Sequence, residues 1–307
     1  MKAIRIHKFG GPEALTYEDV PEPQAGPGEI RIRVMAAGVN PVDWKVRSGT
    51  GGYQPALPLI LGVDVAGVVD SVGAGVETFQ VGDGVMAKTA NAQGGYAEYT
   101  VVNATQAARK PMSVSYVEAA AIPTAGLTAW QALFDTAGLA KGQTVLIHGA
   151  AGGVGSFAVQ FAKWRGARVI GTASGDHLAF VLGLGADEVI DYKVQRFEEK
   201  AHDVDVVFDT IGGDTLERSW GVLKHGGFLV TIVGTIPPGA AEAHQVRAQS
   251  IRTTADGGEL AQIAALIDEQ KIKPVVTTEL PLAEARAAQE MSETHHARGK
   301  IVLRVAA

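Results

Sequence analysis

The chain contains no cysteine among its 307 residues. Disulfides, thiolate nucleophiles and cysteine-ligated zinc are therefore excluded. Basic residues are in the minority, because 27 Lys and Arg stand against 33 Asp and Glu, and there is no basic run that would bind nucleic acid. No apolar run reaches transmembrane length, and the N-terminus lacks a signal-peptide pattern. We therefore expect a cytoplasmic protein that binds neither nucleic acid nor membranes.

Glycine, by contrast, is abundant, with 38 residues. Several glycines gather in residues 144–155, where a β-branched apolar run ends in a glycine-rich loop and an apolar helical stretch, 156–164, follows. This strand–loop–helix order is typical of a dinucleotide-binding unit, with the pyrophosphate at the helix N-terminus. A purely structural turn is the alternative. The residues expected to form the turn, admit the pyrophosphate and let the helix pack on its strand are Gly149, Ala150, Gly152, Gly153, Val154 and Gly155.

The end of the second strand favours NADP(H) over NAD(H). NAD sites usually place Asp or Glu there, whereas this strand ends in small and hydroxyl residues, which leave room for a 2′-phosphate. Asp176 tempers the prediction, and no Arg or Lys follows at once. The stretch 174–176 equally suits a helix N-cap. The candidate residues for this part of the pocket are Thr172, Ala173, Ser174, His177 and Tyr192, with His177 also explained as an ordinary exposed helix residue.

The chain falls into two regions with different patterns of expected secondary structure. Residues 1–116 are rich in β-type runs separated by Gly and Pro, whereas residues 117–255 alternate strands with helices. Ser115 and Glu118 predict a capping box at the start of a helix that Pro123 should break. Six strands are expected in the second region, the last at 250–254, which predicts an α/β fold with a doubly wound sheet. Residues 256–307 are expected to return to the first domain.

Several ordered motifs run along the chain, at 37–45, 61–69, 81–83, 125–130, 144–155, 185–192, 209–213 and 298–303. Together they resemble the medium-chain dehydrogenase/reductase superfamily, in its zinc-free, zeta-crystallin-like quinone oxidoreductase branch. The resemblance covers essentially the whole chain. It implies a β-rich GroES-like catalytic domain and a Rossmann cofactor domain, with the nicotinamide and the substrate in a cleft between them.

The same resemblance identifies what is missing. Zinc alcohol dehydrogenases carry Cys where this chain has Asn40, and a His-Glu pair where it has Val63 and Asp64. Asn and Val cannot replace thiolate and imidazole as zinc ligands, and without the metal there is no Lewis acid to activate an alcohol. We therefore expect no metal site and an acceptor that is already electrophilic, such as a quinone or an α,β-unsaturated carbonyl.

The resemblance places Asn40 and Thr128 beside the nicotinamide, with Thr124 a weaker candidate one turn earlier. A turn residue and a back-bonded helical Thr are the alternatives. Asp43, Lys45 and Tyr53 are candidates for the edge of the active site, although Asp43 could cap a helix, Lys45 could point to water and Tyr53 could anchor its loop. Further cofactor candidates follow the fourth and fifth sheet strands and begin the last one: Thr210, Ile211, Val233, Gly234 and Lys300. Asp209 could cap the next helix, and a solvated Lys300 is favoured.

The function expected from these residues is zinc-independent, NADPH-dependent hydride transfer to quinones or enones by a homodimer. An enoyl-thioester reductase is the alternative enzyme, although no basic docking patch for an acyl carrier stands out. A non-catalytic NADPH-binding protein is the alternative from another class. No triad or paired carboxylate predicts a general acid, so we expect positioning and hydrogen-bond polarisation to carry the reaction, with the proton coming from solvent.

Overall fold

The computed structural model describes residues 1–50, 55–89, 94–295 and 297–306. The chain divides into two compact units, one formed by Met1–Leu127 with Ala255–Ala307 and the other by Thr128–Thr254. The C-terminal segment therefore returns to the unit that contains the N-terminus. The expected boundary at 116/117 precedes the observed division, because α2 (Tyr116–Ala120) packs against β3 and β5 of the first unit.

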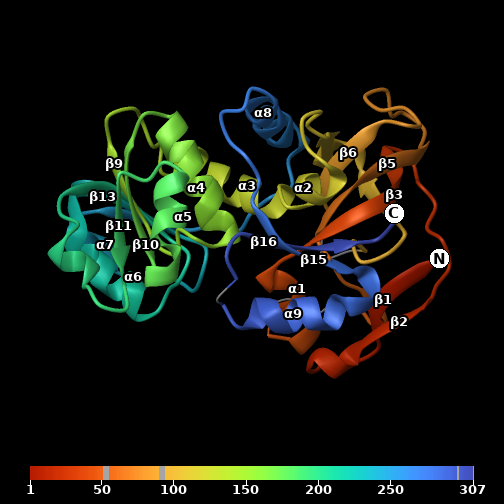
Figure 1. The fold of residues 1–307 in the computed structure, drawn as a ribbon, viewed down its shortest axis with the longest axis horizontal. Coiled ribbons are helices and arrows are strands. Elements are labelled where there is room, and N and C mark those ends of the chain that lie inside the picture. Colours follow the sequence, from red (N-terminus) through yellow and green to blue (C-terminus); the bar gives the residue numbers. More distant parts are fainter. Residues whose placement is uncertain (51–54, 90–93, 296, 307) are drawn as a thin grey trace. The chain divides into compact units, whose positions relative to one another are not determined.

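The strands of the first unit pair mainly antiparallel, and β15 pairs with β16 in parallel. Among its described residues, seven strands form one sheet in the order β15-β16-β3-β5-β6-β8 with β7 paired to β3, and β2-β1-β4 form a second sheet. In Figure 1 the blue strands β15 and β16 of this unit belong with the orange strands β3 and β5, although more than two hundred residues of sequence separate them. The strands are β1 (Lys2–Ile6), β2 (Leu15–Asp19), β3 (Glu29–Val39), β4 (Leu59–Ile60), β5 (Asp64–Val72), β6 (Gly84–Lys88), β7 (Tyr99–Asn103), β8 (Ala107–Arg109), β15 (Val276–Pro281) and β16 (Lys300–Arg304).

Helices cover parts of these sheets. The capping box predicted at Ser115 and Glu118 is confirmed, because the Glu118 backbone N donates to Ser115 Oγ at 3.2 Å and the Ser115 backbone N donates to Glu118 Oε2 at 2.8 Å. The predicted break is confirmed as well, since α2 ends before Pro123 and α3 begins there. The remaining helices of the unit are α1 (Pro41–Ser48), α8 (Gly257–Asp268) and α9 (Ala285–Glu293), and α3 spans Pro123–Trp130.

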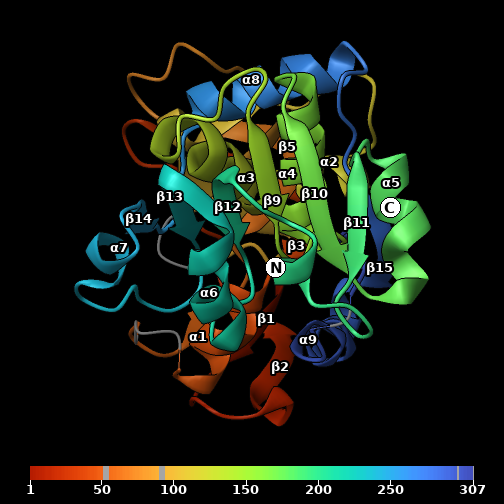
Figure 2. The same cartoon turned by 90° about the vertical axis from the view of Figure 1, so that its left-hand side faces the viewer.

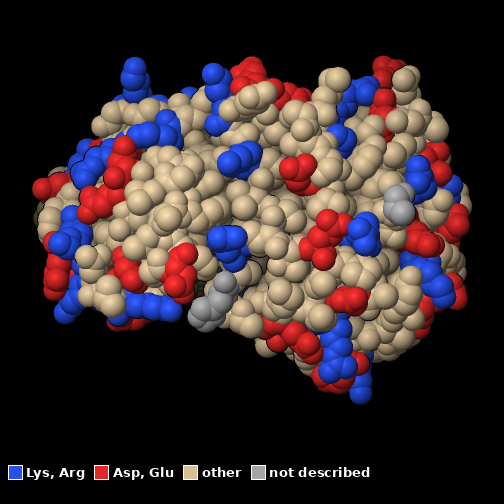
Figure 3. Space-filling view, in the orientation of Figure 1, with Lys and Arg blue, Asp and Glu red and all other residues tan. Residues whose placement is uncertain are grey.

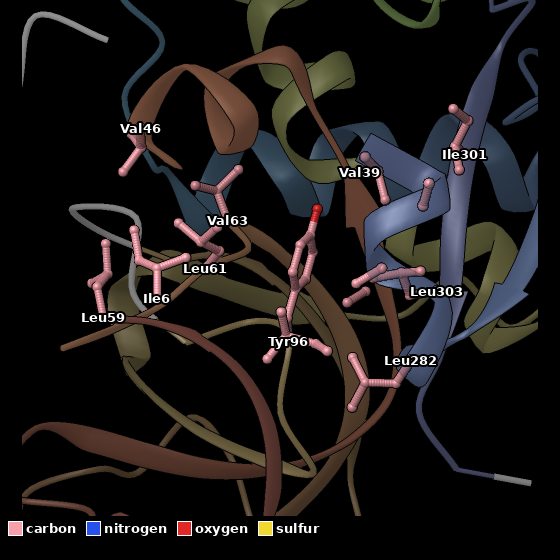
Figure 4. Close-up of a cluster of buried hydrophobic side chains, with 14 of the residues drawn as sticks. Ile6, Val39, Val46, Leu59, Leu61, Val63, Tyr96, Leu282, Ile301 and Leu303 are labelled. Carbon is pink, nitrogen blue, oxygen red and sulfur yellow. The ribbon is translucent and has the colours of Figure 1, made fainter. Parts of the chain in front are cut away.

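One apolar cluster in this unit surrounds Tyr96, whose ring is fully buried. Figure 4 shows Leu61 and Val63 on one side of the Tyr96 ring and Ile301 and Leu303 on the other, with the hydroxyl group at one end of the ring. The cluster includes Val39 at the end of β3, Val63 just before β5 and Ile301 near the start of β16. The buried polar residues Asn40, Asp64 and Lys300 are the chain neighbours of these three.

The second unit is a doubly wound parallel sheet, as predicted. Throughout Thr128–Thr254, all of which is described, six strands pair in the order β11-β10-β9-β12-β13-β14, all parallel. Figure 2 shows β11, β10, β9, β12 and β13 side by side in this order. The elements are β9 (Thr144–Ile147), α4 (Gly153–Trp164), β10 (Arg168–Ala173), α5 (Leu178–Gly183), β11 (Glu188–Asp191), β12 (Val204–Asp209), α6 (Asp214–Ser219), β13 (Leu223–Thr231), α7 (Ala240–Ala243) and β14 (Arg247–Ser250).

The strand predicted at 250–254 is wrong in position, because β14 ends where that prediction begins. This edge strand is mostly exposed, so it lacks the apolar run by which the inner strands are found.

On the face of the molecule drawn in Figure 3, Lys and Arg side chains are interspersed with Asp and Glu. Within the described residues, no helix is both long and apolar enough to span a bilayer.

Candidate functional site

The first unit holds a buried polar cluster formed by Asn40, Asp64 and Lys300. Lys300 Nζ donates to Asn40 Oδ1 at 2.5 Å and to the Val39 carbonyl at 2.9 Å. Asn40 Nδ2 donates to Asp64 Oδ2 at 2.9 Å, and Lys300 Nζ lies 3.7 Å from the same oxygen. All three residues are at most 4 % exposed. The favoured prediction of a solvated Lys300 is therefore wrong: its ammonium group is internal and faces Asn40.

Strand pairing explains why these residues meet. β16 and β5 flank β3, with Ile301 opposite Val39 and Gly38 opposite Asp64. Lys300 precedes Ile301 and Asn40 follows Val39, so antiparallel pairing brings them to the same end of the sheet. Gly38 is required for this arrangement, because a Cβ at that position would lie 2.3 Å from the Ala120 carbonyl oxygen and 3.0 Å from Asp64 Cβ. The carboxylate of Asp64 occupies space that the glycine leaves.

Asp43 lies next to this cluster and is fully buried. Its Oδ2 accepts hydrogen bonds at 2.8 Å from the Asn40 backbone N and from Tyr96 Oη. Among the described residues Oδ1 has no hydrogen-bond partner. Burial raises the pKa of Asp43 to about 7, against the lowering effect of these two donors and of Lys300. Burial and the neighbouring Asp43 raise the pKa of Tyr96 well above 10, so Tyr96 remains a donor. Asp43 thus takes part in the capping box at the start of α1, which is the alternative considered for it.

The raised pKa of Asp43 predicts a pH dependence of stability. Between pH 4 and 7 native Asp43 retains a proton that the unfolded chain has released, so the free energy of unfolding falls as pH rises through this window. The loss across the window is on the order of a few kcal/mol. Asp43→Asn removes this titration. In urea unfolding between pH 4 and 7.5 we expect the variant to gain stability relative to the wild type as pH rises; parallel pH curves would contradict the assignment.

The other candidates of the first unit lie in different surroundings. Thr124 donates from its backbone N and from Oγ1 to Asp64 Oδ1, at 2.9 and 2.6 Å, so it supports the Asp64 carboxylate. Lys45 is half-buried, with Nζ 5.5 Å from the centre of the Trp44 ring. Tyr53 lies outside the described residues. The structure thus brings Asn40, Asp43, Thr124 and Lys300 together.

In the second unit the glycine loop joins β9 to α4. Gly149 has φ +68°, and a Cβ there would lie 2.5 Å from Thr210 Oγ1. A Cβ on Gly155 would lie 2.2 Å from the Gly149 carbonyl oxygen, so the close helix packing predicted for Gly155 is confirmed. Gly152 is the N-cap of α4 and provides no side-chain cap, while Gly152, Gly153 and Val154 are partly exposed. Ala150 is buried. The first N–H groups of α4 are thus suited to an anion.

A buried histidine supports this loop. His148 Nδ1 lies 3.2 Å from Thr172 Oγ1, which also accepts from the Gly149 backbone N at 3.3 Å. His148 Nε2 lies 3.0 Å from Ser219 Oγ, which itself donates to the Thr215 carbonyl. The hydrogen bonds are therefore all satisfied by the neutral Nε2–H form. Burial lowers the pKa of His148 to about 4, which agrees with that form.

The strand that ends at Ala173 leads into the predicted 2′-phosphate region. Ala173 is buried, and Ser174 is 8 % exposed with Oγ 3.3 Å from His177 Nδ1. His177 is half-buried, whereas the Tyr192 side chain is 53 % exposed. Ser174 is the N-cap of a short 3-10 turn, but its side chain makes no capping hydrogen bond. Ser174 and His177 thus lie within hydrogen-bond distance of each other, and their role toward a 2′-phosphate stays a prediction.

Strands β12 and β13 position the remaining candidates. Asp209 was considered as a helix cap, but it accepts from the backbone N of Ile211 and of Gly212 and so closes the turn before α6. Thr210 Oγ1 donates to the His148 carbonyl, and Ile211 is 56 % exposed. Val233 and Gly234 lie just beyond β13, which the sequence predicts at 228–233 but which spans Leu223–Thr231.

Thr128 Oγ1 lies 2.5 Å from Thr253 Oγ1, and the Thr128 side chain is 3 % exposed. Thr253 follows β14, so this hydroxyl pair joins the start of the second unit to its end. Gln131 makes further contacts there, because its Nε2 donates to the Thr254 carbonyl and to Thr254 Oγ1, and its Oε1 accepts from the Thr254 backbone N.

Sequence reasoning missed several residues of these networks. Asp64 and His148 each carry a polar group at the end of an otherwise apolar, buried strand run, and this is the signal that could have identified them. Tyr96, Ser219 and Thr253 carried no comparable local signal, because their roles depend on partners distant in sequence.

The polar cluster of the first unit is poorly suited to a metal ion. The Asp64 carboxylate already accepts from Asn40 and Thr124, and the Lys300 ammonium lies 3.7 Å from it. A divalent cation would have to displace these donors and tolerate the ammonium charge. Within the described part of the chain, no group of three or more His, Cys, Asp or Glu side chains could hold a metal ion.

Comparison with known proteins identifies the family. A model described as the alcohol dehydrogenase GroES-like domain matches residues 26–112, and one described as zinc-binding dehydrogenase matches residues 184–303. The quinone oxidoreductase of Mus musculus is 34 % identical, covering 98 % of this chain and 96 % of its own length. The chloroplastic NADPH-dependent alkenal/one oxidoreductase of Arabidopsis thaliana is 36 % identical, covering 99 % of this chain and 79 % of its own.

A solved structure agrees with these relatives. The Escherichia coli quinone oxidoreductase complexed with NADPH superposes with a TM-score of 0.91 at 31 % identity, covering 99 % of this chain and 100 % of the other. The chain therefore belongs to the medium-chain dehydrogenase/reductase superfamily, in its quinone oxidoreductase branch. The predicted architecture, a GroES-like domain with a Rossmann-type domain, is confirmed.

Proposed function

We propose that this protein is an NADPH-dependent reductase that transfers a hydride to quinones or α,β-unsaturated carbonyl compounds without zinc. The observation that carries the proposal is the glycine loop of the second unit. It follows β9, whose neighbours β10 and β12 lie on its two sides, and this is the point where the strand order of the sheet reverses. Ligands of open parallel sheets bind at such a point. A relative named as an NADPH-dependent oxidoreductase and a similar structure solved in complex with NADPH support the choice of cofactor.

The residues present fit NADPH. The N-terminus of α4, capped by Gly152, would hold the pyrophosphate, and Ser174 with His177 would receive the 2′-phosphate. Bound NADPH would supply the hydride. Asn40 and Thr128 are proposed to orient the reacting groups through hydrogen bonds. They are not proposed to transfer a proton, because neither side chain titrates in the working pH range. The remaining candidates for cofactor contact are Gly149, Gly153, Val154, Tyr192, Ile211, Val233 and Gly234.

The acceptor follows from the chemistry of the polar cluster. Asp64 is engaged by Lys300, Asn40 and Thr124, so the cluster offers no vacant carboxylate for a Lewis-acidic metal. Alcohol oxidation relies on such an ion in the zinc enzymes of this superfamily. A quinone or an enone needs no metal to accept a hydride, because its carbonyl already withdraws electrons from the reacting carbon.

Absorbance at the NADPH band tests the proposal. The purified protein is mixed with NADPH and one compound from each of three classes: quinones, enones and enoyl thioesters. We expect oxidation with quinones or enones. Turnover of enoyl thioesters alone would establish the alternative enzyme, and tight NADPH binding without any turnover would establish a non-catalytic binding protein. The same assay after dialysis against a chelator should give unchanged rates.

Ser174 provides a prediction about cofactor choice. An Asp at this position would place a carboxylate against the 2′-phosphate and could accept hydrogen bonds from the ribose hydroxyls of NADH. We expect Ser174→Asp to weaken NADPH binding by about tenfold or more and to leave NADH binding equal or better. Calorimetry with both cofactors measures this, with Ser174→Asn as the neutral control of similar size. If Ser174→Asp bound NADPH as tightly as the wild type, the phosphate pocket would lie elsewhere.

A homodimer in the cytoplasm is part of the same proposal and rests on the family resemblance and the composition. Light scattering at several protein concentrations measures the oligomeric state, and cell fractionation measures the location. A monomeric mass throughout would contradict the dimer without touching the reaction.

A further inference from the structure

The Asn40 side-chain amide makes hydrogen bonds through both its oxygen and its nitrogen. Its Oδ1 accepts from the Lys300 ammonium at 2.5 Å, and its Nδ2 donates to the Asp64 carboxylate at 2.9 Å and to the Gly38 carbonyl at 3.5 Å. A flipped amide would place its NH2 group against the ammonium and its oxygen against the carboxylate, and both contacts would be repulsive. The two charged partners therefore select one of the two amide orientations.

The charged partners are themselves fixed. Asp64 Oδ1 accepts two hydrogen bonds from Thr124, and Lys300 Nζ also donates to the Val39 carbonyl. Gly299 (φ +62°) precedes Lys300, whose backbone N donates to the Val275 carbonyl at 2.9 Å. These contacts are buried, so charge-assisted hydrogen bonds between them are strong and poorly screened.

We propose that Lys300 is a positioning residue for the reductase reaction: with Asp64 it holds the Asn40 amide in one orientation, so that Asn40 Oδ1 keeps a fixed direction toward the reacting groups. This inference rests on the proposed function. It assigns Lys300 a role through Asn40 and not by contact with cofactor or substrate. The ammonium also polarises the Asn40 carbonyl, which makes the amide N–H groups better donors.

The central experiment is a double-mutant cycle. Lys300→Met keeps a side chain of similar length and removes the charge. We expect kcat to fall by about 10–100-fold. The NADPH Kd, measured by calorimetry, should change by less than about threefold. In Asn40→Ala the amide is absent, so adding Lys300→Met should lower kcat by less than about threefold more. Multiplicative losses in the double variant would overturn the proposal. Lys271→Met, at an exposed lysine, is the matched control and should behave as wild type.

A second variant addresses folding. Lys300→Met leaves Asp64 buried without its cationic partner, which can destabilise the native state. Lys300→Met combined with Asp64→Asn removes both charges and keeps the side-chain sizes. We expect this neutral pair to fold, as judged by its melting temperature and circular dichroism, and still to show the fall in kcat. Wild-type kcat in the folded neutral pair would overturn the proposal.

A readout without turnover separates this inference from the proposed function. The side-chain amide of Asn40, assigned by NMR from its absence in Asn40→Ala, should give two resolved N–H signals that exchange slowly with solvent in the wild type. Lys300→Met should shift these signals and speed their exchange. Unchanged signals would overturn the proposed positioning of Asn40 by Lys300, even if the enzyme is active. A wild-type enzyme that reduces neither quinones nor enones would instead refute the proposed function and leave the NMR result standing.

Discussion

NADPH binding should be lost when Gly152 is replaced by valine, and the fold should be retained. Gly152 caps α4 and is partly exposed, so an added isopropyl group would project into the space where the pyrophosphate meets the first N–H groups of the helix. The backbone tolerates the change, because φ is −74° and the nearest atom to an added Cβ is the Gly149 carbonyl oxygen at 3.4 Å. Valine at Gly153 should have the same effect on binding.

Two controls make this prediction sharp. Gly183→Val places the same side chain on α5, where an added Cβ meets nothing within 4 Å, and should leave NADPH binding intact. Gly155→Ala should instead destabilise the unit, because its Cβ would lie 2.2 Å from the Gly149 carbonyl oxygen. Calorimetry measures binding and circular dichroism measures folding. If Gly152→Val bound NADPH normally, the loop would be only a structural turn.

Substitutions at Asn40 and Thr128 should lower kcat more than they weaken NADPH binding. Each is proposed to orient the reacting groups, and the loss of one such oriented hydrogen bond costs on the order of 10–1000-fold in rate. We expect Asn40→Ala and Thr128→Val each to lower kcat by a factor in this range, with a smaller change in NADPH Kd. Neither substitution should remove an ionisation from the pH–rate profile, since neither side chain titrates there.

Conservative variants distinguish this role from a structural one. Thr128→Ser keeps the hydroxyl that lies 2.5 Å from Thr253 Oγ1 and should recover most of the rate. Melting temperatures should be compared for all variants, because both side chains are buried. Wild-type turnover in Asn40→Ala and Thr128→Val, on every substrate that the enzyme accepts, would show that the active site lies elsewhere.

Local patterns in the sequence identified the elements that short-range physics specifies. The capping box at Ser115, the break at Pro123 and the glycine loop between β9 and α4 each depend on residues a few positions apart. The inner strands of the parallel sheet were found because they are continuous apolar runs. The exposed edge strand β14 was misplaced for the opposite reason, since little of it is buried.

The sequence by itself determined the doubly wound sheet and the position of the glycine loop, because strand propensity, glycine conformation and helix capping are all encoded locally. The superfamily followed from the resemblance of several ordered motifs. Only the tertiary structure decided what Lys300, Asp64 and Asp43 do. Lys300 follows Asn40 by 260 positions, and the pairing of β16 with β3 brings the two side chains together. Burial then changes the chemistry of two of these groups. It raises the pKa of Asp43 to about 7 and lowers the pKa of Lys300, because charged groups lose the stabilisation of water. No local pattern reports burial that distant strands create.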